Sequence, residues 1–153
     1  NPRAHYETTG PEILKEVKDV SFIVAGIGSG GTIVGAGKFL KEKNKEIKVI
    51  GIEPKSSPLI TENKSGPHKI QGIGANFIPK IYDKDIVDKV ITVSDEDSYE
   101  TVRLIANKLG ILVGISSGAN IFGAMKLCDE NPDEVVVTVA PDGVDKYMSM
   151  GIF

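Results

Sequence analysis

The residues with the clearest chemical potential form a glycine-rich loop, Gly28 to Thr32. Closely spaced glycines allow backbone amides to turn toward an anion, and a helix that begins there adds the positive end of its dipole. Ser29 and Thr32 contribute two hydroxyl donors. No P-loop lysine follows the glycines, so the loop does not look built for nucleoside triphosphate hydrolysis. We interpret it as a phosphate-binding loop; the alternative is a glycine turn that only lets a helix pack closely on a strand.

The same segment contains a second pattern, G-x-G-x-x-G, at Gly26, Gly28 and Gly31. Glu53 follows at about the twenty-residue spacing at which dinucleotide-binding domains place an acid for a ribose hydroxyl. The spacing is therefore also compatible with a nicotinamide-binding Rossmann domain. Against it, Pro54 follows Glu53 directly, and Gly31 with the next threonine stands where a Rossmann helix usually begins.

Two polar segments come later in the chain. Ser116, Ser117 and Gly118 follow the apolar run at 111–115. A serine in this position is most often an N-cap, and we expect that role for one of the two. A cap needs one hydroxyl, which leaves Ser116 as a candidate ligand-binding residue. The segment at 141–143, Pro-Asp-Gly, is typical of a plain turn.

For the two histidines and the single cysteine, the sequence predicts no role in chemistry. His5 and His68 lie among polar residues without a suitably spaced acid or serine, so we expect surface roles for both. Cys128 falls on a helix with Met125 and Leu127 and is expected to be an inert core residue. A single cysteine cannot form an internal disulfide, and it has no Cys or His clustered near it, so we expect no metal site.

The helices and strands that must position these residues are predicted from hydrophobic periodicity, capping residues, prolines and glycines. A capping box at Thr9-Gly10-Pro11-Glu12 predicts a short helix that ends near residue 17. Apolar, β-branched runs predict buried strands at 20–25, 47–53, 87–93, 111–115 and 135–140. Helices are expected at 32–43, from a Ser94 cap to about 110, and at 119–130. Prolines and glycines make 54–85 mostly loop, with room for a short helix at 57–63.

Strands that alternate with helices predict an α/β fold with a three-layer, mostly parallel, doubly wound sheet. Ligands of such sheets bind beyond the carboxyl ends of the strands. The glycine loop, the serine segment and the 141–143 turn each follow a predicted strand. We therefore expect the three to meet at one edge of the sheet.

Composition excludes several classes. The chain has 153 residues, 41% of them hydrophobic and 25% charged, which is ordinary for one globular domain. No apolar run approaches the ~18 residues of a membrane span. The net charge of -3 and the lack of a basic block argue against a nucleic-acid partner. The sequence starts at Asn1 with neither methionine nor a signal-peptide pattern, so we expect a cytoplasmic protein and a piece of something longer.

Taken together, the motifs resemble the cysteine synthase (O-acetylserine sulfhydrylase) family of fold-type II pyridoxal-phosphate enzymes. The resemblance runs over essentially the whole chain and rests on five ordered segments. They are HYETTGPEI at 5–13, GSGGT at 28–32, KIQGIG at 69–74, GISSGA at 114–119, and PDG at 141–143 with Lys146-Tyr147.

The resemblance implies a cofactor, pyridoxal 5′-phosphate, and the residues that hold it. It assigns phosphate binding to Gly28, Ser29, Gly30, Gly31 and Thr32. It assigns the pyridine nitrogen to Ser116, the first serine of the Ser-Ser-Gly segment. It places Gln71, Gly72, Ile73 and Gly74 beside the substrate. The family's Schiff-base lysine lies upstream of anything that matches Asn1, and none of the sixteen lysines here lies in its motif, so no catalytic residue is expected in this chain.

The implied activity is synthesis of L-cysteine and acetate from O-acetyl-L-serine and sulfide by β-replacement. A neutral hydroxyl at the ring nitrogen suits elimination better than transamination. Residues 1–153 would form one α/β domain of a two-domain enzyme, the carboxyl-terminal portion without the smaller amino-terminal domain. The implied partners are a small-molecule substrate, a second copy in a homodimer, and the carboxyl-terminal peptide of serine acetyltransferase.

The chain departs from the family pattern at Ser29, where threonine is usual, and at Asn76, where glycine is usual. Cystathionine β-synthase and O-phosphoserine sulfhydrylase are alternatives within the family. Cystathionine β-synthase usually has Gly-Ser-Ala-Gly-Ser at the serine segment, so the residues at 115–119 favour cysteine synthesis. A nicotinamide-binding domain and a non-catalytic interaction module are the alternatives outside it.

Overall fold

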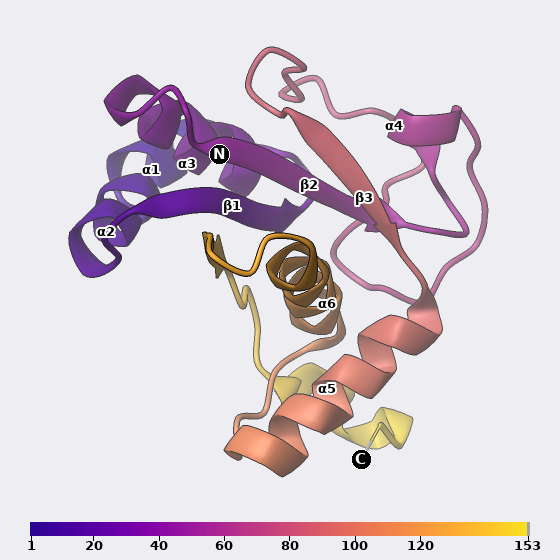
Figure 1. The fold of residues 1–153 in the computed structure, drawn as a ribbon. Helices are drawn as coiled ribbons and strands as arrows, with labels where there is room; N and C mark the ends of the chain where they lie inside the picture. The colour runs from indigo at the N-terminus through magenta and orange to yellow at the C-terminus, as the bar shows by residue number, and fades with distance from the viewer. Residues whose placement is uncertain (153) are drawn as a thin grey trace.

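The computed structural model describes residues 1–152, without the side chains of residues 146 and 150. A four-stranded sheet with the order β3-β2-β1-β4 lies at its centre (Figure 1). Every neighbouring pair of strands is parallel. The strands are β1 (Val20–Gly26), β2 (Lys48–Pro54), β3 (Lys89–Val93) and β4 (Val135–Thr138). The predicted parallel α/β sheet is confirmed.

Helices cover both faces of the sheet. The first group is α1 (Pro2–Glu7), α2 (Thr9–Glu16) and α3 (Gly31–Lys43), and the second is α5 (Asp95–Leu109) and α6 (Ile115–Glu130). In the first group α3 packs on the sheet and the other two pack on α3; in the second, α6 packs on the sheet and α5 on α6. A short α4 (Leu59–Glu62) and a 3₁₀ helix, η1 (Val144–Met150), complete the elements. The three expected layers are present.

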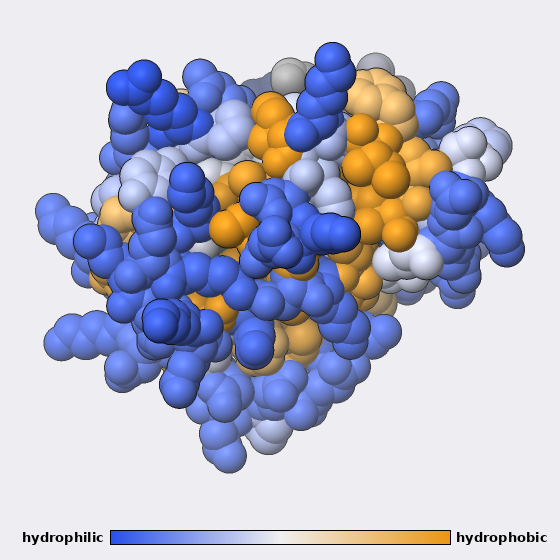
Figure 2. Space-filling model, turned by 90° about the horizontal axis from the view of Figure 1, so that it is seen from above, coloured by the Kyte–Doolittle hydropathy of each residue, from blue (hydrophilic) through white to orange (hydrophobic). Residues whose placement is uncertain are grey.

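The sheet is buried on both sides, as parallel sheets are. Along β1, Val24 belongs to the core beneath α6, whereas Ile23 and Ala25 belong to the core beneath α3. This explains why the strand reads as a continuous apolar run, because neither face meets water. Figure 2 shows one face of the molecular surface, where hydrophilic residues predominate and apolar patches lie between them.

The predicted start of the first helix is wrong. The predicted capping box does not form, because α2 already includes Thr9 and its N-cap is Thr8, which makes no side-chain cap. The Thr8 hydroxyl donates instead to the carbonyl oxygen of Ala4, at 2.7 Å, in the preceding helix α1. Helix α1 has no counterpart among the helices predicted from the sequence.

The predicted strand at 111–115 is also wrong. Ile111 and Leu112 are exposed, Val113 forms an isolated antiparallel bridge with Gly143, and Ile115 is already the first residue of α6. Five apolar residues fit a buried strand or a buried helix start equally well by periodicity, and here packing selects the helix.

The order of the strands decides where a ligand can bind. The chain leaves β1 through α3 to reach β2 on one side, whereas β4, on the other side of β1, follows α6 on the opposite face. The connections therefore diverge at the carboxyl ends of β1 and β4. Such a switch point opens a crevice between the two loops that leave the sheet.

Candidate active site

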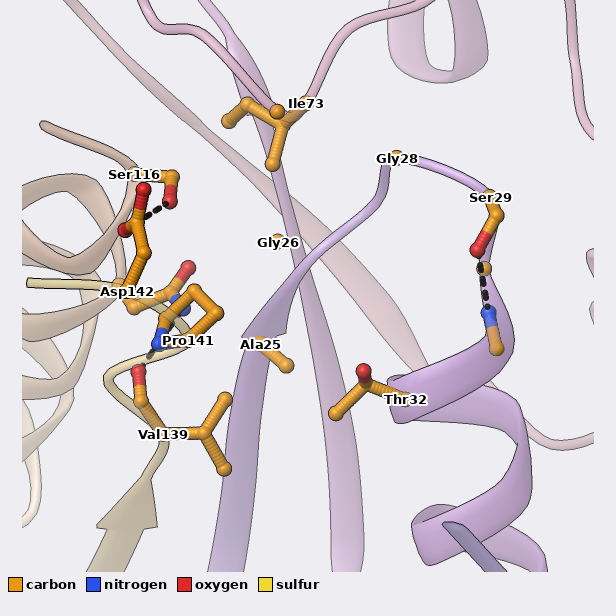
Figure 3. A pocket seen from close by; sticks show the side chains of 14 residues that line it. Ala25, Gly26, Gly28, Ser29, Thr32, Ile73, Ser116, Val139, Pro141 and Asp142 are labelled. Carbon is orange, nitrogen blue, oxygen red and sulfur yellow. Dashed lines mark hydrogen bonds between the residues drawn. The ribbon is translucent and has the colours of Figure 1, made fainter. Parts of the chain in front are cut away.

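A cavity of about 270 Å³ lies at this switch point (Figure 3). Figure 3 shows Ser29 and Thr32 on one wall, Ser116 and Asp142 on the opposite wall, and the end of β1 between them. The sequence-predicted loop and serine are therefore brought together. The lining residues are Ala25, Gly26, the loop Gly28–Thr32, Gly72, Ile73, Ser116, Asn120, Val139, Pro141 and Asp142.

The glycine loop forms the first wall. Gly30 is the N-cap of α3 and has the left-handed φ of 87°, which a residue with a Cβ adopts only with strain. Having no side chain, Gly30 cannot cap the first amides of α3. The Gly31 N–H donates to Ser29 Oγ at 3.3 Å. The loop thus presents helix N-terminal amides and two hydroxyls to the cavity, a set of donors suited to an anion.

Gly28 brings two segments of the site into contact. A Cβ added at Gly28 would overlap the carbonyl oxygen of Gly72. The Gly74 N–H donates to the carbonyl oxygen of Ile27 at 3.1 Å, so the two segments are also joined by a backbone hydrogen bond. The absence of a side chain at Gly28 is therefore required for the cavity to close on this side.

His5 supports the loop from below, contrary to the expected surface role. Its Nε2 lies 3.2 Å from Thr32 Oγ1, and its Nδ1 lies 2.8 Å from Thr9 Oγ1. Partial burial is the chief cause that lowers the pKa of His5, so the neutral imidazole is favoured. One ring nitrogen of a neutral imidazole donates and the other accepts, which allows His5 to orient the Thr32 hydroxyl.

The second wall is built around Asp142. The Tyr147 hydroxyl donates to Asp142 Oδ2 at 2.6 Å, and the Ser116 hydroxyl lies within a long donor distance of Oδ1, 3.5 Å. The Ser117 hydroxyl donates to the backbone oxygen of Asp142 at 3.3 Å. Burial, and then the hydrogen bond to Asp142, raises the pKa of Tyr147 to about 12, so this phenol stays protonated and neutral.

Two interpretations of this wall are corrected. Neither Ser116 nor Ser117 caps α6, because both lie inside its first turn and the N-cap is Gly114. The 141–143 turn is more than a turn, because Asp142 lines the cavity and accepts hydrogen bonds from the Ser116 and Ser117 hydroxyls and the Gly114 N–H. Ser116 and Asp142 lie 26 residues apart in sequence, so no local pattern indicated the pairing.

Asn120 forms part of the same wall and was not singled out from the sequence. It lies one turn beyond Ser116 on α6, is 1% exposed and lines the cavity. Its Nδ2 donates to the carbonyl oxygen of Val139 at 3.0 Å. The spacing of four residues on one helix could have indicated that Asn120 shares a face with Ser116.

The substrate segment predicted at 71–74 is divided by the structure. Gly72 and Ile73 line the cavity, whereas Gln71 is exposed and does not. Gly74 lies beyond the cavity, where His68 Nε2 is 2.9 Å from its carbonyl oxygen. His68 is half-buried and shapes this segment, so the surface role expected for it is wrong.

The side chain of Glu53 is hydrogen-bonded to the backbone and does not face the cavity. Its carboxylate is 3% exposed and accepts from the N–H groups of Ile60 and Thr61, each at 2.9 Å, at the start of α4. These bonds occupy both oxygens that a dinucleotide-binding domain would offer to a ribose. The structure therefore argues against the nicotinamide interpretation of the glycine pattern.

Cys128 is exposed, so the expected core position is wrong. Over residues 1–152, no cluster of three or more His, Cys, Asp or Glu side chains is arranged to hold a metal ion. In the same part of the chain, none of the helices is both long and apolar enough to cross a bilayer.

The fold and the cavity define a parallel α/β protein with a glycine loop at the switch point of its sheet. A family model described as pyridoxal-phosphate dependent enzyme matches residues 1–142. The chain belongs to this family of pyridoxal-phosphate dependent enzymes.

Named relatives agree with the family. Cysteine synthase B of Campylobacter jejuni is 47% identical over 154 residues, which cover 100% of this chain and 51% of the relative. Cysteine synthase of Staphylococcus aureus is 42% identical and is covered to 50%. The chain therefore spans about half the length of the curated relatives it matches.

Solved structures agree as well. O-acetylserine sulfhydrylase isoform 3 of Entamoeba histolytica superposes with a TM-score of 0.95 at 35% identity, over 99% of this chain and 46% of the other. An O-acetylserine dependent cystathionine β-synthase of Helicobacter pylori superposes with a TM-score of 0.93 at 42% identity, over 99% of this chain and 50% of the other. The fold implied by the sequence resemblance is thereby confirmed.

Proposed function

We propose that this chain serves a cysteine synthase, which forms L-cysteine and acetate from O-acetyl-L-serine and sulfide with pyridoxal 5′-phosphate. The observation that carries the proposal is the cavity with a donor-rich glycine loop on one wall and Ser116 beside Asp142 on the other. The relatives named cysteine synthase and O-acetylserine sulfhydrylase support it.

The residues present fit the two polar ends of this cofactor. The amides and hydroxyls of the Gly28–Thr32 loop suit a phosphate, because they are donors at the positive end of α3. A Cβ on Gly28 would overlap the carbonyl oxygen of Gly72, and one on Gly31 would lie 2.7 Å from the Asn1 nitrogen, so neither position of the loop has room for a side chain. Ser116 offers a neutral hydroxyl on the opposite wall, where the pyridine nitrogen would be held.

When bound, the cofactor supplies a pyridine ring that withdraws electrons from the α-carbon of the amino acid. The residues of this chain bind and orient. Thr32, oriented by His5, and Ser29 would hold the phosphate, and Ser116 would position the ring nitrogen. Gly72 and Ile73 line the cavity between these two walls. We assign no catalytic residue to residues 1–153, and the Schiff-base lysine is proposed to come from outside them.

A chimera tests the activity. Residues 1–153 replace the matching half of the Campylobacter jejuni relative, and formation of L-cysteine from O-acetyl-L-serine and sulfide is measured. We expect activity, and a loss of cofactor affinity in Thr32→Val of about tenfold for a lost hydrogen bond to a charged group. A folded chimera that binds pyridoxal 5′-phosphate but forms only cystathionine from homocysteine would replace this proposal with the alternative that the Helicobacter pylori structure favours.

The nicotinamide alternative has its own measurement. Titration of the chain with NADH, followed by its fluorescence, is expected to show no binding, because both Glu53 carboxylate oxygens already accept from backbone N–H groups of α4. Saturable NADH binding would overturn the assignment of the cavity. Peptide binding without any cofactor affinity would instead support the non-catalytic interaction module.

The proposal extends to assembly and location. The enzyme is proposed to be a cytoplasmic homodimer in which one domain, residues 1–153, holds the cofactor and a smaller amino-terminal domain completes the site. The carboxyl-terminal peptide of serine acetyltransferase is proposed to enter the same cavity. Light scattering of the chimera and competition of that peptide with O-acetyl-L-serine measure these points; a monomer, or a peptide that does not compete, would contradict them.

A further inference from the structure

Helix α1 packs directly against the first turns of α3, and two glycines of α3 make this close approach possible. A Cβ on Gly35 would overlap the carbonyl oxygen of Pro2 and lie 2.9 Å from His5 Cβ. Gly31, four residues earlier and on the same face of α3, has no room for a side chain against the start of α1 either. The short distance between the two backbones brings the His5 ring within reach of Thr32.

His5 links two hydroxyl groups, and one of them belongs to the cavity. Its Nδ1 lies 2.8 Å from Thr9 Oγ1 in α2, and its Nε2 lies 3.2 Å from Thr32 Oγ1 in α3. Thr32 lines the cavity, whereas His5 does not. His5 can therefore act on an occupant of the cavity only through the Thr32 hydroxyl.

The position of the ring proton decides what Thr32 offers to the cavity. A neutral imidazole carries its proton on one nitrogen and accepts at the other. With the proton on Nδ1, the ring donates to Thr9, and the Thr32 hydroxyl must donate to Nε2, so that only its lone pairs face the cavity. With the proton on Nε2, the ring donates to Thr32 Oγ1, and the Thr32 hydrogen is free to donate into the cavity. Both arrangements satisfy the ring, but only the second offers a donor to an anion.

The charged form of His5 has the same effect on Thr32, because both nitrogens of an imidazolium donate. Burial first, and the positive Asn1 amino group second, lower the pKa of His5. The groups that α2 and α3 place against the ring are the neutral hydroxyls of Thr9 and Thr32. An anion in the cavity acts in the opposite direction, because a negative charge favours the imidazolium. Binding of an anion and binding of a proton at Nε2 therefore strengthen each other.

We propose that His5 is a positioning residue that couples phosphate binding to its own proton: the bound phosphate selects the forms of His5 with a proton on Nε2, in which Thr32 donates to the phosphate. The inference rests on the proposed function and deepens it, because it makes the affinity of the glycine loop depend on a histidine that does not line the cavity. A phosphate group should be held more tightly when His5 is charged than when it is neutral.

The first test records the ¹⁵N signals of the His5 ring in the wild-type chain, with and without inorganic sulfate. Sulfate keeps its charge over the range in which histidine titrates, about pH 5 to pH 8, so its own protonation does not enter. The chain has two histidines, and the signals that His5→Gln removes belong to His5. We expect a protonated Nε2 in the sulfate-bound chain and a His5 pKa that sulfate raises. A sulfate-bound chain with the proton on Nδ1 alone would overturn the proposal.

The affinity for sulfate gives the second test. In wild type it should be about fivefold to tenfold higher near pH 5 than near pH 8, the size of a modest coupling between two sites. His5→Gln keeps an amide NH₂ that can donate to Thr32 but cannot gain a proton, so the pH dependence should disappear. His5→Asn is too short to reach Thr32 and should weaken sulfate about threefold to tenfold near pH 8, the effect of one lost hydrogen bond.

Thr8→Val is the matched control. Thr8 lies between α1 and α2, and its exposed hydroxyl donates to the carbonyl oxygen of Ala4 at 2.7 Å, next to His5 in sequence. The variant removes a hydrogen bond from the same junction without touching the His5 ring. It should change neither the ring signals nor the pH dependence of sulfate binding, and a loss of that pH dependence would contradict the role of the His5 proton.

The outcomes separate the two proposals. Wild-type chain that binds neither inorganic phosphate nor sulfate contradicts the proposed function. Wild-type chain that binds both, with an unprotonated Nε2 or with a pH dependence that His5→Gln leaves unchanged, contradicts the role of His5 while the proposed function stands. The ring signals are measured on the wild-type chain, so they decide the question even if His5→Asn folds poorly.

Discussion

Contacts of single residues fix the positions of the two walls of the cavity. Gly28 lets the glycine loop touch the segment at 72–74, and Asp142 ties the start of α6 to the segment before η1. The immediate sequence neighbours of Asp142 do not indicate this contact. Both residues act through contact with a distant segment, which is why small changes at them should have large effects.

Gly28→Ala is expected to lower the free energy of unfolding by about 1–3 kcal/mol, because the added methyl group meets the fixed backbone oxygen of Gly72. Affinity for inorganic phosphate should fall with it. The measurements are urea unfolding and a phosphate titration. Gly110→Ala is the control: Gly110 has a φ of 67° but no atom within 4 Å of an added Cβ, so only backbone strain of about 1 kcal/mol is expected, with phosphate affinity unchanged. Equal effects of the two variants on phosphate binding would contradict the prediction.

Tyr147→Phe is expected to change the alkaline limb of the stability profile. The pKa of Tyr147 is raised from 10.0 to about 12, so its contribution is complete below pH 10 and is lost as the pH rises through that interval. Relative to the variant, wild type should lose on the order of 2 kcal/mol across it. Unfolding of both proteins by urea at several pH values measures the difference, in which the other tyrosines cancel. Parallel profiles would show that Asp142 does not retain the Tyr147 proton.

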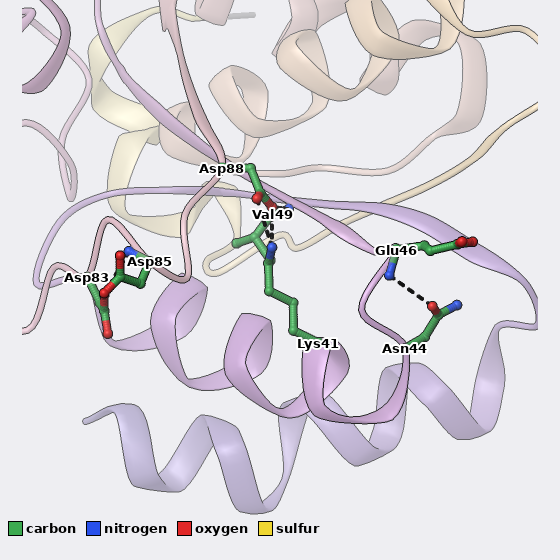
Figure 4. Close-up of polar contacts among 7 residues, drawn as sticks. All are labelled: Lys41, Asn44, Glu46, Val49, Asp83, Asp85 and Asp88. Carbon is green, nitrogen blue, oxygen red and sulfur yellow. Dashed lines mark hydrogen bonds and ion pairs between the residues drawn. The ribbon is translucent and has the colours of Figure 1, made fainter.

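Helices and strands supply the next level of positioning. The loop before β3 is fastened to β2 and α3 by Asp88, which accepts from Val49 N–H at 2.8 Å and pairs with Lys41 at 2.7 Å (Figure 4). Burial alone would raise the pKa of Asp88, but the hydrogen bonds from Lys41 and Val49 outweigh it and hold the pKa below its ordinary value. Because α3 carries the glycine loop at its other end, this contact helps to fix the first wall.

Asp88→Asn is expected to cost about 1 kcal/mol at neutral pH, as a charge-assisted hydrogen bond at a half-exposed position is lost. A depressed carboxyl pKa stabilises the fold above the unfolded value of 3.8 and less as the pH falls through the folded value. The difference between wild type and variant should therefore shrink as the pH falls below 3.8. Asp83→Asn, which alters a local turn bond to Asp85, is the control and should show a smaller difference at neutral pH. A constant Asp88 difference at all pH values would contradict the electrostatic origin.

At the scale of the whole molecule, the cavity joins the two helical layers across the sheet. One wall belongs to α3 and the other to α6, so an occupant that contacts both cross-links the two cores on either side of the sheet. A ligand that binds the folded chain and not the unfolded chain stabilises it by mass action.

Thermal unfolding measures this coupling. At one hundred times its dissociation constant, 4′-deoxypyridoxine 5′-phosphate should add about 2.7 kcal/mol and raise the Tm by about 5–10 °C. Pyridoxine without the phosphate group, at the same concentration, should shift the Tm far less, because the glycine loop then has no anion to bind. Equal shifts for the two compounds would contradict the assignment of the loop.

Local chemistry made much of this architecture predictable. The strands β1 and β2, the helix after the glycine loop and the Ser94 cap of α5 follow from apolar runs, glycine punctuation and one hydroxyl, whose Oγ accepts from Asp97 N–H. Each of these signals depends on residues within one turn or strand of one another. Where the signal was short, as at 111–115, periodicity could not distinguish a strand from the start of a helix.

The sequence by itself determined the class of fold, the glycine loop between β1 and α3 and the family motifs, because side-chain period and glycine geometry are local properties. Only the tertiary structure decided which residues meet. His5 reaches Thr32 from 27 residues away, Asp142 reaches Ser116 from 26, and Glu53 turns to α4 instead of the cavity. These pairings depend on how layers pack across the sheet, and packing brings together residues whose positions along the chain carry no common signal.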